Sequence, residues 1–123
     1  MRRWWLLLAW GLLVGCDGES SQTLPYEDEA ARTARALCSH AEKCEGQAGS
    51  YDACFQRVTE LLAGVRSELE TESGAALAGC IQCLRTLSSE HEAALDSQCQ
   101  SAPDDARIRA ACGSERQACA GAP

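Results

Sequence analysis

The sequence predicts an all-α protein, a small disulfide-stapled helical bundle of three main helices plus short C-terminal helical pieces. Apolar residues recur at three- and four-residue spacing in one segment after another, and no stretch alternates between apolar and polar residues as a half-buried strand does. The chain has nine cysteines, whereas only thirteen Leu, Ile and Val residues follow residue 15. A core this thin usually needs covalent cross-links, which cysteines can supply.

The first helix is expected to open at Pro25 and to stop at Gly46. Proline suits the first turn of a helix, and the acidic residues at 27–29 complement the positive end of the helix dipole. Glycine favours the left-handed conformation that commonly ends a helix. The inward side of this helix is predicted to consist of Ala34, Leu37, Cys38, Ala41 and Cys44.

The second segment, 51–69, has the clearest helical pattern in the chain. Ser50 is a suitable N-cap, because its side-chain oxygen can accept a hydrogen bond from a free N–H of the first turn. Gly64 in the interior costs about 1 kcal/mol relative to alanine, which indicates a close helix crossing at this point. The predicted apolar face comprises Tyr51, Cys54, Phe55, Val58, Leu61, Leu62, Val65 and Leu69.

The third helix is followed by a region that is predicted to break into short pieces. Ser89–Glu92 has the pattern of a capping box, which predicts a new helix start with an exposed His91. Ser101–Asp104 can start another helix that stops at Gly113, and Ser114–Gln117 can start a last turn. The inward residues of the third helix and of these pieces are predicted to be Leu77, Cys80, Ile81, Leu84, Leu87, Ile108 and Cys112.

Residues 1–15 have the pattern of a cleaved export signal. Arg2 and Arg3 precede an apolar run from Trp4 to Val14, and the small Gly15 closes the segment. The run is too short for a transmembrane helix, which needs roughly 20 residues. The two arginines directly follow the initiator methionine, so a simple basic leader of the Sec type is a better interpretation than a twin-arginine signal.

The end of this leader, Leu13-Val14-Gly15-Cys16, resembles the lipobox of bacterial lipoproteins. In that family a diacylglycerol is attached to the cysteine thiol, signal peptidase II cuts before the cysteine, and the new amine is often acylated, for example with palmitate. The resemblance therefore implies cleavage between Gly15 and Cys16 and lipidation of Cys16. The alternatives are a plain signal peptide with an incidental cysteine and an apolar N-terminal core helix.

Three parts of the chain are expected: the leader (1–15), the lipidated cysteine with a polar tether (16–25), and a cysteine-rich helical domain (26–123). Without the leader, nine basic residues stand against eighteen acidic ones. A chain with this net negative charge has no surface for nucleic acid and gains nothing from anionic lipid headgroups. The acyl chains on Cys16 are therefore expected to supply the membrane affinity. No cofactor other than this covalent lipid is predicted.

An even number of cysteines remains when Cys16 is set aside. An even count is what a disulfide framework requires, and an exported protein forms disulfides in preference to keeping thiolates. This parity agrees with a separate role for Cys16. The cysteines predicted to form four disulfides are Cys38, Cys44, Cys54, Cys80, Cys83, Cys99, Cys112 and Cys119.

Hairpin geometry gives a hypothesis for the pairing. If the turn between the first two helices is centred near residue 49, Cys44 and Cys54 lie level with each other and can bond. Cys38 is then expected to bond to Cys83, or to Cys80 one turn away, on the third helix. The other bonds would involve Cys99, Cys112, Cys119 and the cysteine left over from the 80–83 pair.

Cys80-Ile81-Gln82-Cys83 also has the spacing of a thiol–disulfide redox motif. Redox chemistry of this kind needs the first cysteine at a helix N-terminus within a βαβ unit. Here the motif lies inside a predicted helix and no strand is predicted, so a structural disulfide role is favoured. A periplasmic thiol–disulfide or metal-handling protein using Cys80 and Cys83 is the alternative.

No metal site and no catalytic residue are predicted. His40 lies between two cysteines, but no second pair at zinc-finger spacing follows. The acidic residues at 68, 70 and 72 are interpreted as solvated surface, and the chain has no nucleophile elbow and no glycine-rich phosphate loop.

The body of the chain resembles the small cysteine-rich lipoproteins of Gram-negative envelopes, a resemblance that implies no particular activity. We expect a non-enzymatic protein on the periplasmic face or the cell surface, anchored to the membrane by its acyl chains. Its role would be structural or the binding of another macromolecule, such as a protein partner in the envelope. The choice between inner and outer membrane stays open.

Overall fold

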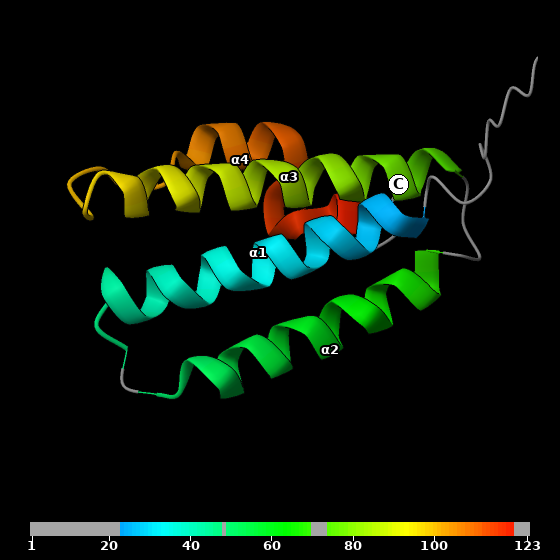
Figure 1. Cartoon of the computed structure of the whole chain (residues 1–123). Helices are drawn as coiled ribbons and strands as arrows, with labels where there is room; N and C mark the ends of the chain where they lie inside the picture. The colour runs from blue at the N-terminus through cyan, green and yellow to red at the C-terminus, as the bar shows by residue number, and fades with distance from the viewer. Residues whose placement is uncertain (1–22, 48, 70–73, 120–123) are drawn as a thin grey trace, which may run out of the picture.

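The computed structural model describes residues 23–47, 49–69 and 74–119 of the chain (Figure 1). All regular structure in this part is helical, which confirms the predicted all-α class. The elements are three long helices and two short ones: α1 (Thr23–Lys43), α2 (Tyr51–Leu69), α3 (Gly74–Asp96), α4 (Asp105–Cys112) and the 3₁₀ helix η1 (Ser114–Cys119).

The predicted leader, the lipobox and Cys16 lie outside the described residues. The predicted tether (16–25) also lies outside them except for its last three residues, which belong to α1. None of the helices that the structure describes is long and apolar enough to cross a membrane.

α1 is the central helix of the fold, with α2 on one side and α3 on the other (Figure 1). α2 runs antiparallel to α1, whereas α3 runs parallel to it. α4 and η1 both pack on α3, and α2 makes almost no contact with α3. The bundle is therefore open along the edge between α2 and α3, and this opening determines where a binding site can lie.

The ends of α1 follow from local chemistry. The helix begins two residues before Pro25, which therefore lies in the first turn, where a missing N–H costs no hydrogen bond. It ends at Lys43, and Gly46 has a φ of 62°, the left-handed conformation predicted for the stop. The N–H of Gln47 then donates to the carbonyl of Ala41 at 3.0 Å, which satisfies one of the last helical carbonyls.

α2 begins directly after Ser50, as predicted, and its apolar face is only partly covered. Leu62 and Leu69 are buried, but Leu61 is 64% exposed. The predicted close crossing at Gly64 is wrong, because this glycine is exposed and a Cβ added there would meet no atom within 4 Å. α2 thus packs against α1 through a narrow strip and leaves apolar side chains beside it uncovered.

α3 is one uninterrupted helix to Asp96, so the predicted new start at Ser89–Glu92 is wrong. The inward face of the helix continues through this region, since Leu87 and Ala94 are both buried. The serine and the second glutamate of the apparent capping box contact Arg32 of α1 instead of free backbone N–H groups. Burial of the last turns of α3 therefore outweighs the local capping pattern.

The two C-terminal pieces are found where the sequence predicts them. Asp104 caps α4, since its Oδ1 accepts hydrogen bonds from the N–H groups of Ala106 at 3.0 Å and Arg107 at 3.3 Å. Gly113 ends α4 with a φ of 74°, and its N–H donates to the carbonyl of Arg109 at 2.8 Å. η1 follows at once and turns the chain back along α3.

The eight cysteines that follow Cys16 are all paired, which confirms the predicted disulfide framework. One disulfide joins α1 to α2, one joins the end of α1 to the end of α3, and two fasten α4 and η1 to α3. The pairs are Cys38–Cys54, Cys44–Cys99, Cys83–Cys112 and Cys80–Cys119.

The predicted pairing of Cys44 with Cys54, and of Cys38 with Cys83 or Cys80, is wrong. The turn between α1 and α2 is centred closer to residue 46, so Cys38 lies level with Cys54, at a Cα–Cα distance of 5.8 Å. Cys44 lies just past the end of α1. Because α3 runs parallel to α1, the residues that follow α3 reach this same end, where Cys44 bonds to Cys99.

The core is thin, as expected, and disulfide sulfur makes up much of it. Five of the cysteines in the described residues are buried, compared with four leucines: Cys38, Cys80, Cys83, Cys112 and Cys119 against Leu62, Leu69, Leu84 and Leu87. Tyr26 adds the largest buried side chain, and its hydroxyl donates to the carbonyl of Leu62. Burial raises the pKa of Tyr26 to about 12, against a smaller opposite effect of Arg66.

Candidate binding site

The cysteines of the CxxC motif belong to two different disulfides. Cys80 bonds to Cys119 of η1, and Cys83 bonds to Cys112 of α4. Both are fully buried in α3, past its first turn. A redox-active cysteine needs partial exposure and a pKa lowered by a helix N-terminus or a nearby cation. This geometry instead makes the pair two attachment points for the C-terminal pieces.

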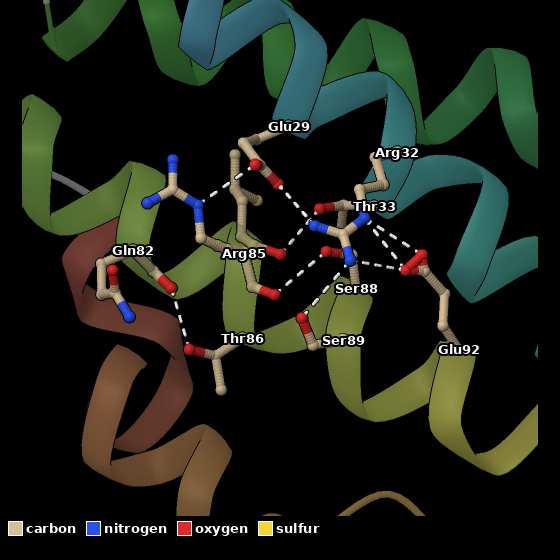
Figure 2. Close-up of polar contacts among 10 residues, drawn as sticks. Glu29, Arg32, Thr33, Gln82, Arg85, Thr86, Ser88, Ser89 and Glu92 are labelled. Atoms are coloured by element: carbon tan, nitrogen blue, oxygen red, sulfur yellow. Dashed lines mark hydrogen bonds and ion pairs between the residues drawn. The ribbon is translucent and has the colours of Figure 1, made fainter.

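A cluster of charged side chains joins α1 to α3 (Figure 2). We call Glu29, Arg32, Arg85 and Glu92 the α1–α3 clasp. Arg32 donates to Glu92 through Nη2 at 2.7 Å and through Nε at 2.9 Å. Glu29 accepts from Arg85 Nε at 3.2 Å and lies 3.6 Å from Arg32 Nη1. The two carboxylates and two guanidiniums thus alternate along the interface.

The clasp has the properties of a structural contact rather than of a catalytic centre. Hydrogen bonding to Glu92 is the main cause that raises the pKa of Arg32, which keeps this guanidinium charged. Both carboxylates are paired with cations, whereas a general acid or base needs a carboxyl group poised near neutral pH and free to reach a substrate. Beside the clasp, the Thr33 hydroxyl donates to the carbonyl of Leu84 at 2.9 Å, inside the interface.

The clasp is absent from the sequence predictions, although the sequence carries a signal for it. The acidic residues at 27–29 suit the opening of a helix, yet Glu29 lies in the second turn of α1 with its side chain only 14% exposed. Glu29 and Arg32 share a face at a spacing of three residues, and Arg85, Ser89 and Glu92 share a face at spacings of four and three. Two complementary polar stripes on neighbouring helices indicate a contact of this kind.

His40 and His91 form a second contact between α1 and α3. Their rings meet edge to face with centroids 5.0 Å apart. His91 is half-buried rather than exposed as predicted, because the helix continues through it, and its Nδ1 lies 2.8 Å from the carbonyl oxygen of Leu87. Burial is the main cause that lowers the pKa of His91, and the charges of His40 and Arg116 act in the same direction.

The neighbourhood of His40 offers no cluster of metal ligands. Cys38 and Cys44, which flank it in the sequence, are both in disulfides. The nearest carboxylate oxygen, from Glu45, lies 3.3 Å from its Nδ1. Across residues 23–47, 49–69 and 74–119, no three His, Cys, Asp or Glu side chains are arranged to hold a metal ion.

An apolar pocket of about 250 Å³ lies between α2 and α3, which make very little contact with each other. Helices α1, α2 and α3 and the 3₁₀ helix η1 all contribute to it. Its walls are mostly aliphatic, with the Cys119 sulfur and a single charged side chain among them. The lining residues are Thr33, Leu37, Leu61, Leu62, Val65, Leu84, Leu87, Arg116 and Cys119.

The pocket exists because α1 separates the apolar faces of α2 and α3. Leu61 and Val65 on α2 line the same space as Leu84 and Leu87 on α3, and the two helices make very little direct contact with each other. The Cys80–Cys119 disulfide holds η1 at this space. Leu62, Leu84 and Leu87 are buried core residues, as their helical spacing predicts, and they also line this opening.

Arg116 is the charged residue of the pocket lining. Its backbone has a φ of 58°, an uncommon left-handed conformation for a residue other than glycine. The side chain is exposed, and none of the carboxylates whose side chains the structure describes forms an ion pair with it. A guanidinium, which carries five N–H donors, therefore lies beside an apolar space without a carboxylate partner among the described side chains.

No protein-family model, no curated protein and no solved structure matches this chain. The features of the chain that bear on its function are the disulfide framework, the paired charges of the clasp and the apolar pocket with its guanidinium.

Proposed function

We propose that this protein is an exported bacterial lipoprotein, held on a membrane by acyl chains on Cys16, with a non-enzymatic binding role in the cell envelope. The observation that carries the binding role is the apolar pocket between α2 and α3. Binding sites are typically concave and lined by apolar side chains, with a few polar groups that orient the bound molecule. The pocket has this composition.

The use of the cysteines supports the exported location. Eight cysteines pair among themselves in the described residues, as is typical of small proteins from oxidising compartments. Cys16 is the ninth cysteine of the chain and has no partner left among the other eight. This count agrees with a separate use of Cys16 as the lipid-bearing residue.

The charged groups and the CxxC motif favour binding over chemistry. The carboxylates of the clasp are paired with arginines, and Cys80 and Cys83 are buried in separate disulfides. The alternative, a thiol–disulfide or metal-handling protein, requires a reducible Cys80–Cys83 pair. Thiol titration under denaturing, non-reducing conditions should find no free thiol among the eight cysteines. A stable reduced pair at 80 and 83 would favour the alternative.

The lipid anchor is tested by Cys16→Ser in bacteria labelled with a palmitate analogue. The variant should incorporate no label, keep its leader and lose processing by signal peptidase II. A double variant, Cys44→Ser with Cys99→Ser, removes a disulfide but retains Cys16, so it should be labelled like the wild type. If Cys16→Ser is still labelled or still processed at residue 16, the lipoprotein assignment is wrong.

A further inference from the structure

We infer that the pocket between α2 and α3 binds a single-chain fatty acid, with the alkyl chain among the aliphatic walls and the carboxylate on Arg116. This inference names the ligand class of the proposed binding role. It does not depend on the lipidation of Cys16.

The size and the walls of the pocket fit one alkyl chain. An apolar cavity of about 150 Å³ takes up benzene, so the space here holds roughly ten carbons. The pocket volume is about 250 Å³. Leu84 and Leu87 line it from α3, and Leu61 and Val65 line it from α2. The hydroxyl of Thr33 already donates to a backbone carbonyl, so it does not make this wall polar.

The lining of the pocket includes a side chain that is open to solvent, Leu61. Leu61 is the most exposed large apolar side chain among the described residues, at 64%. Burial of an alkyl chain against such a side chain removes apolar surface of both groups from water, which favours binding. An amphiphile can therefore enter with its tail between the helices and keep its head group at the rim.

Charge selects the head group. The protein has a net charge of −7, which on the whole disfavours the approach of anions. Arg116 is the local exception in the lining, and its guanidinium has no carboxylate partner among the side chains that the structure describes. A guanidinium can donate two parallel hydrogen bonds to one carboxylate. Apolar walls together with a guanidinium that has no carboxylate partner among the described side chains indicate an anionic amphiphile rather than a neutral one.

The experiment uses residues 16–123 with Cys16→Ser, exported behind a cleavable leader so that the disulfides form. This chain contains every helix and disulfide of the described structure. Decanoate and decanol are titrated below their aggregation concentrations, with calorimetry and methyl NMR as readouts. Decanoate should bind with one site per chain and shift the methyl signals of Leu84, Leu87 and Val65. Decanol should bind about tenfold more weakly, because it cannot pair with a cation.

Two variants and a matched control assign the contacts. Arg116→Gln should weaken decanoate binding about tenfold and leave decanol binding unchanged. Arg109→Gln makes the same substitution at an exposed arginine of α4 outside the lining, and should leave both ligands unaffected. Val65→Trp should fill the pocket and abolish binding of both. The circular dichroism spectrum of Val65→Trp shows whether this variant folds. Arg116→Gln is an independent test, because the Arg116 side chain is exposed and its substitution should not disturb the fold.

Four outcomes would overturn the inference. The first is no binding of decanoate, and the second is equal binding of decanoate by the wild type and Arg116→Gln. A third is a dimer that Leu61→Gln dissociates, which would make a second copy the occupant. The fourth concerns the lipidated protein in nanodiscs. If it does not bind decanoate, and its methyl signals already lie where decanoate shifts them in the unlipidated protein, its own acyl chain is the occupant. The labelling of Cys16 is a separate readout, so failure here leaves the lipoprotein proposal intact.

Discussion

Helices α2 and α3 flank the same central helix but are held to it in different ways. α3 meets α1 through the α1–α3 clasp, the histidine pair and a disulfide at the end of the interface, and it is covered on other sides by α4 and η1. α2 is joined to α1 through the Cys38–Cys54 disulfide, the hydrogen bond from the Tyr26 hydroxyl to the carbonyl of Leu62, and the ion pair between Glu27 and Arg66.

The comparison shows that a strong amphipathic pattern does not ensure full burial. α2 has the clearer helical pattern in the sequence, yet only Leu62 and Leu69 of its side chains are buried. α3 has six buried residues because three other elements pack on it. The apolar surface that α2 leaves uncovered forms one wall of the pocket, so the weakly packed helix is the one that creates the candidate site.

The largest expected effect is the loss of stability when a disulfide is removed, and this loss should be greater for a disulfide of α3 than for the disulfide of α2. Replacing the Cys80–Cys119 pair by alanines should lower the free energy of unfolding by about 4 kcal/mol, and replacing the Cys38–Cys54 pair by about 3 kcal/mol, from loop-closure entropy. The sequence separations are 39 and 16 residues. Urea unfolding under non-reducing conditions measures both values. If removal of Cys38–Cys54 lowers the free energy of unfolding as much as removal of Cys80–Cys119, or more, the expected difference between the α2 and α3 regions is wrong.

The next effect concerns leucines on the two sides of the pocket. Leu84→Ala on α3 should destabilise the protein by about 3 kcal/mol, because a fully buried leucine leaves a cavity. Leu61→Ala on α2 should change stability by less than about 0.5 kcal/mol, as most substitutions at exposed sites do. Their exposed fractions are 1% and 64%. The same unfolding assay tests both, and similar losses would mean that α2 is packed more tightly than described.

A smaller effect is expected at the clasp. Arg32→Met should cost about 1 kcal/mol, the upper end for a partly exposed ion pair with two-point geometry. The side chains of Arg32 and Glu92 are 38% and 36% exposed, so solvent screens part of their attraction. Arg35→Met, at an exposed position of the same helix, is the control and should have almost no effect. High salt should reduce the difference between the two variants; a salt-independent difference would indicate lost packing instead.

The smallest effect is a pH dependence from His91. Its pKa is lowered in the folded protein, so below the ordinary value near 6.5 the unfolded chain binds more protons than the folded one. Stability should therefore be fully present above about pH 7 and decrease as the pH falls through about 6.5 toward the folded pKa. His91→Gln should flatten this part of the profile in unfolding experiments at pH 5.5 to 7.5. An unchanged slope would assign the dependence to other groups.

The helices were largely predictable because their signals are local. The stop at Gly46, the cap at Asp104 and the stop at Gly113 each depend on one residue and its neighbours in the chain, and all three are found. The apparent capping box at Ser89–Glu92 failed for a tertiary reason. Burial of the following turn against α1 and the pull of Arg32 on Glu92 keep α3 continuous, and neither is encoded next to the box.

The disulfide pairing and the pocket depend on how helices are placed relative to one another. A shift of about three residues in the centre of one turn was enough to change the partners of Cys38 and Cys44. Helical spacing identified the lining leucines as inward residues. It could not show that α2 and α3 would lie on opposite sides of α1 and leave a space between them. Arg116 gave no signal in the sequence, because its importance comes only from that space.

The overlap of the disulfides has a consequence for proteolysis. The loops closed by Cys38–Cys54, Cys44–Cys99 and Cys80–Cys119 overlap, so every peptide bond from Cys38 to Cys119 is bridged by at least one of them. A protease that nicks the chain once in this span releases no fragment. A single cut ahead of Cys38 separates everything behind it in one piece. For a protein attached through Cys16, one cleavage between Cys16 and Cys38 would shed the cross-linked body whole, whereas one cut between Cys38 and Cys119 would leave it attached.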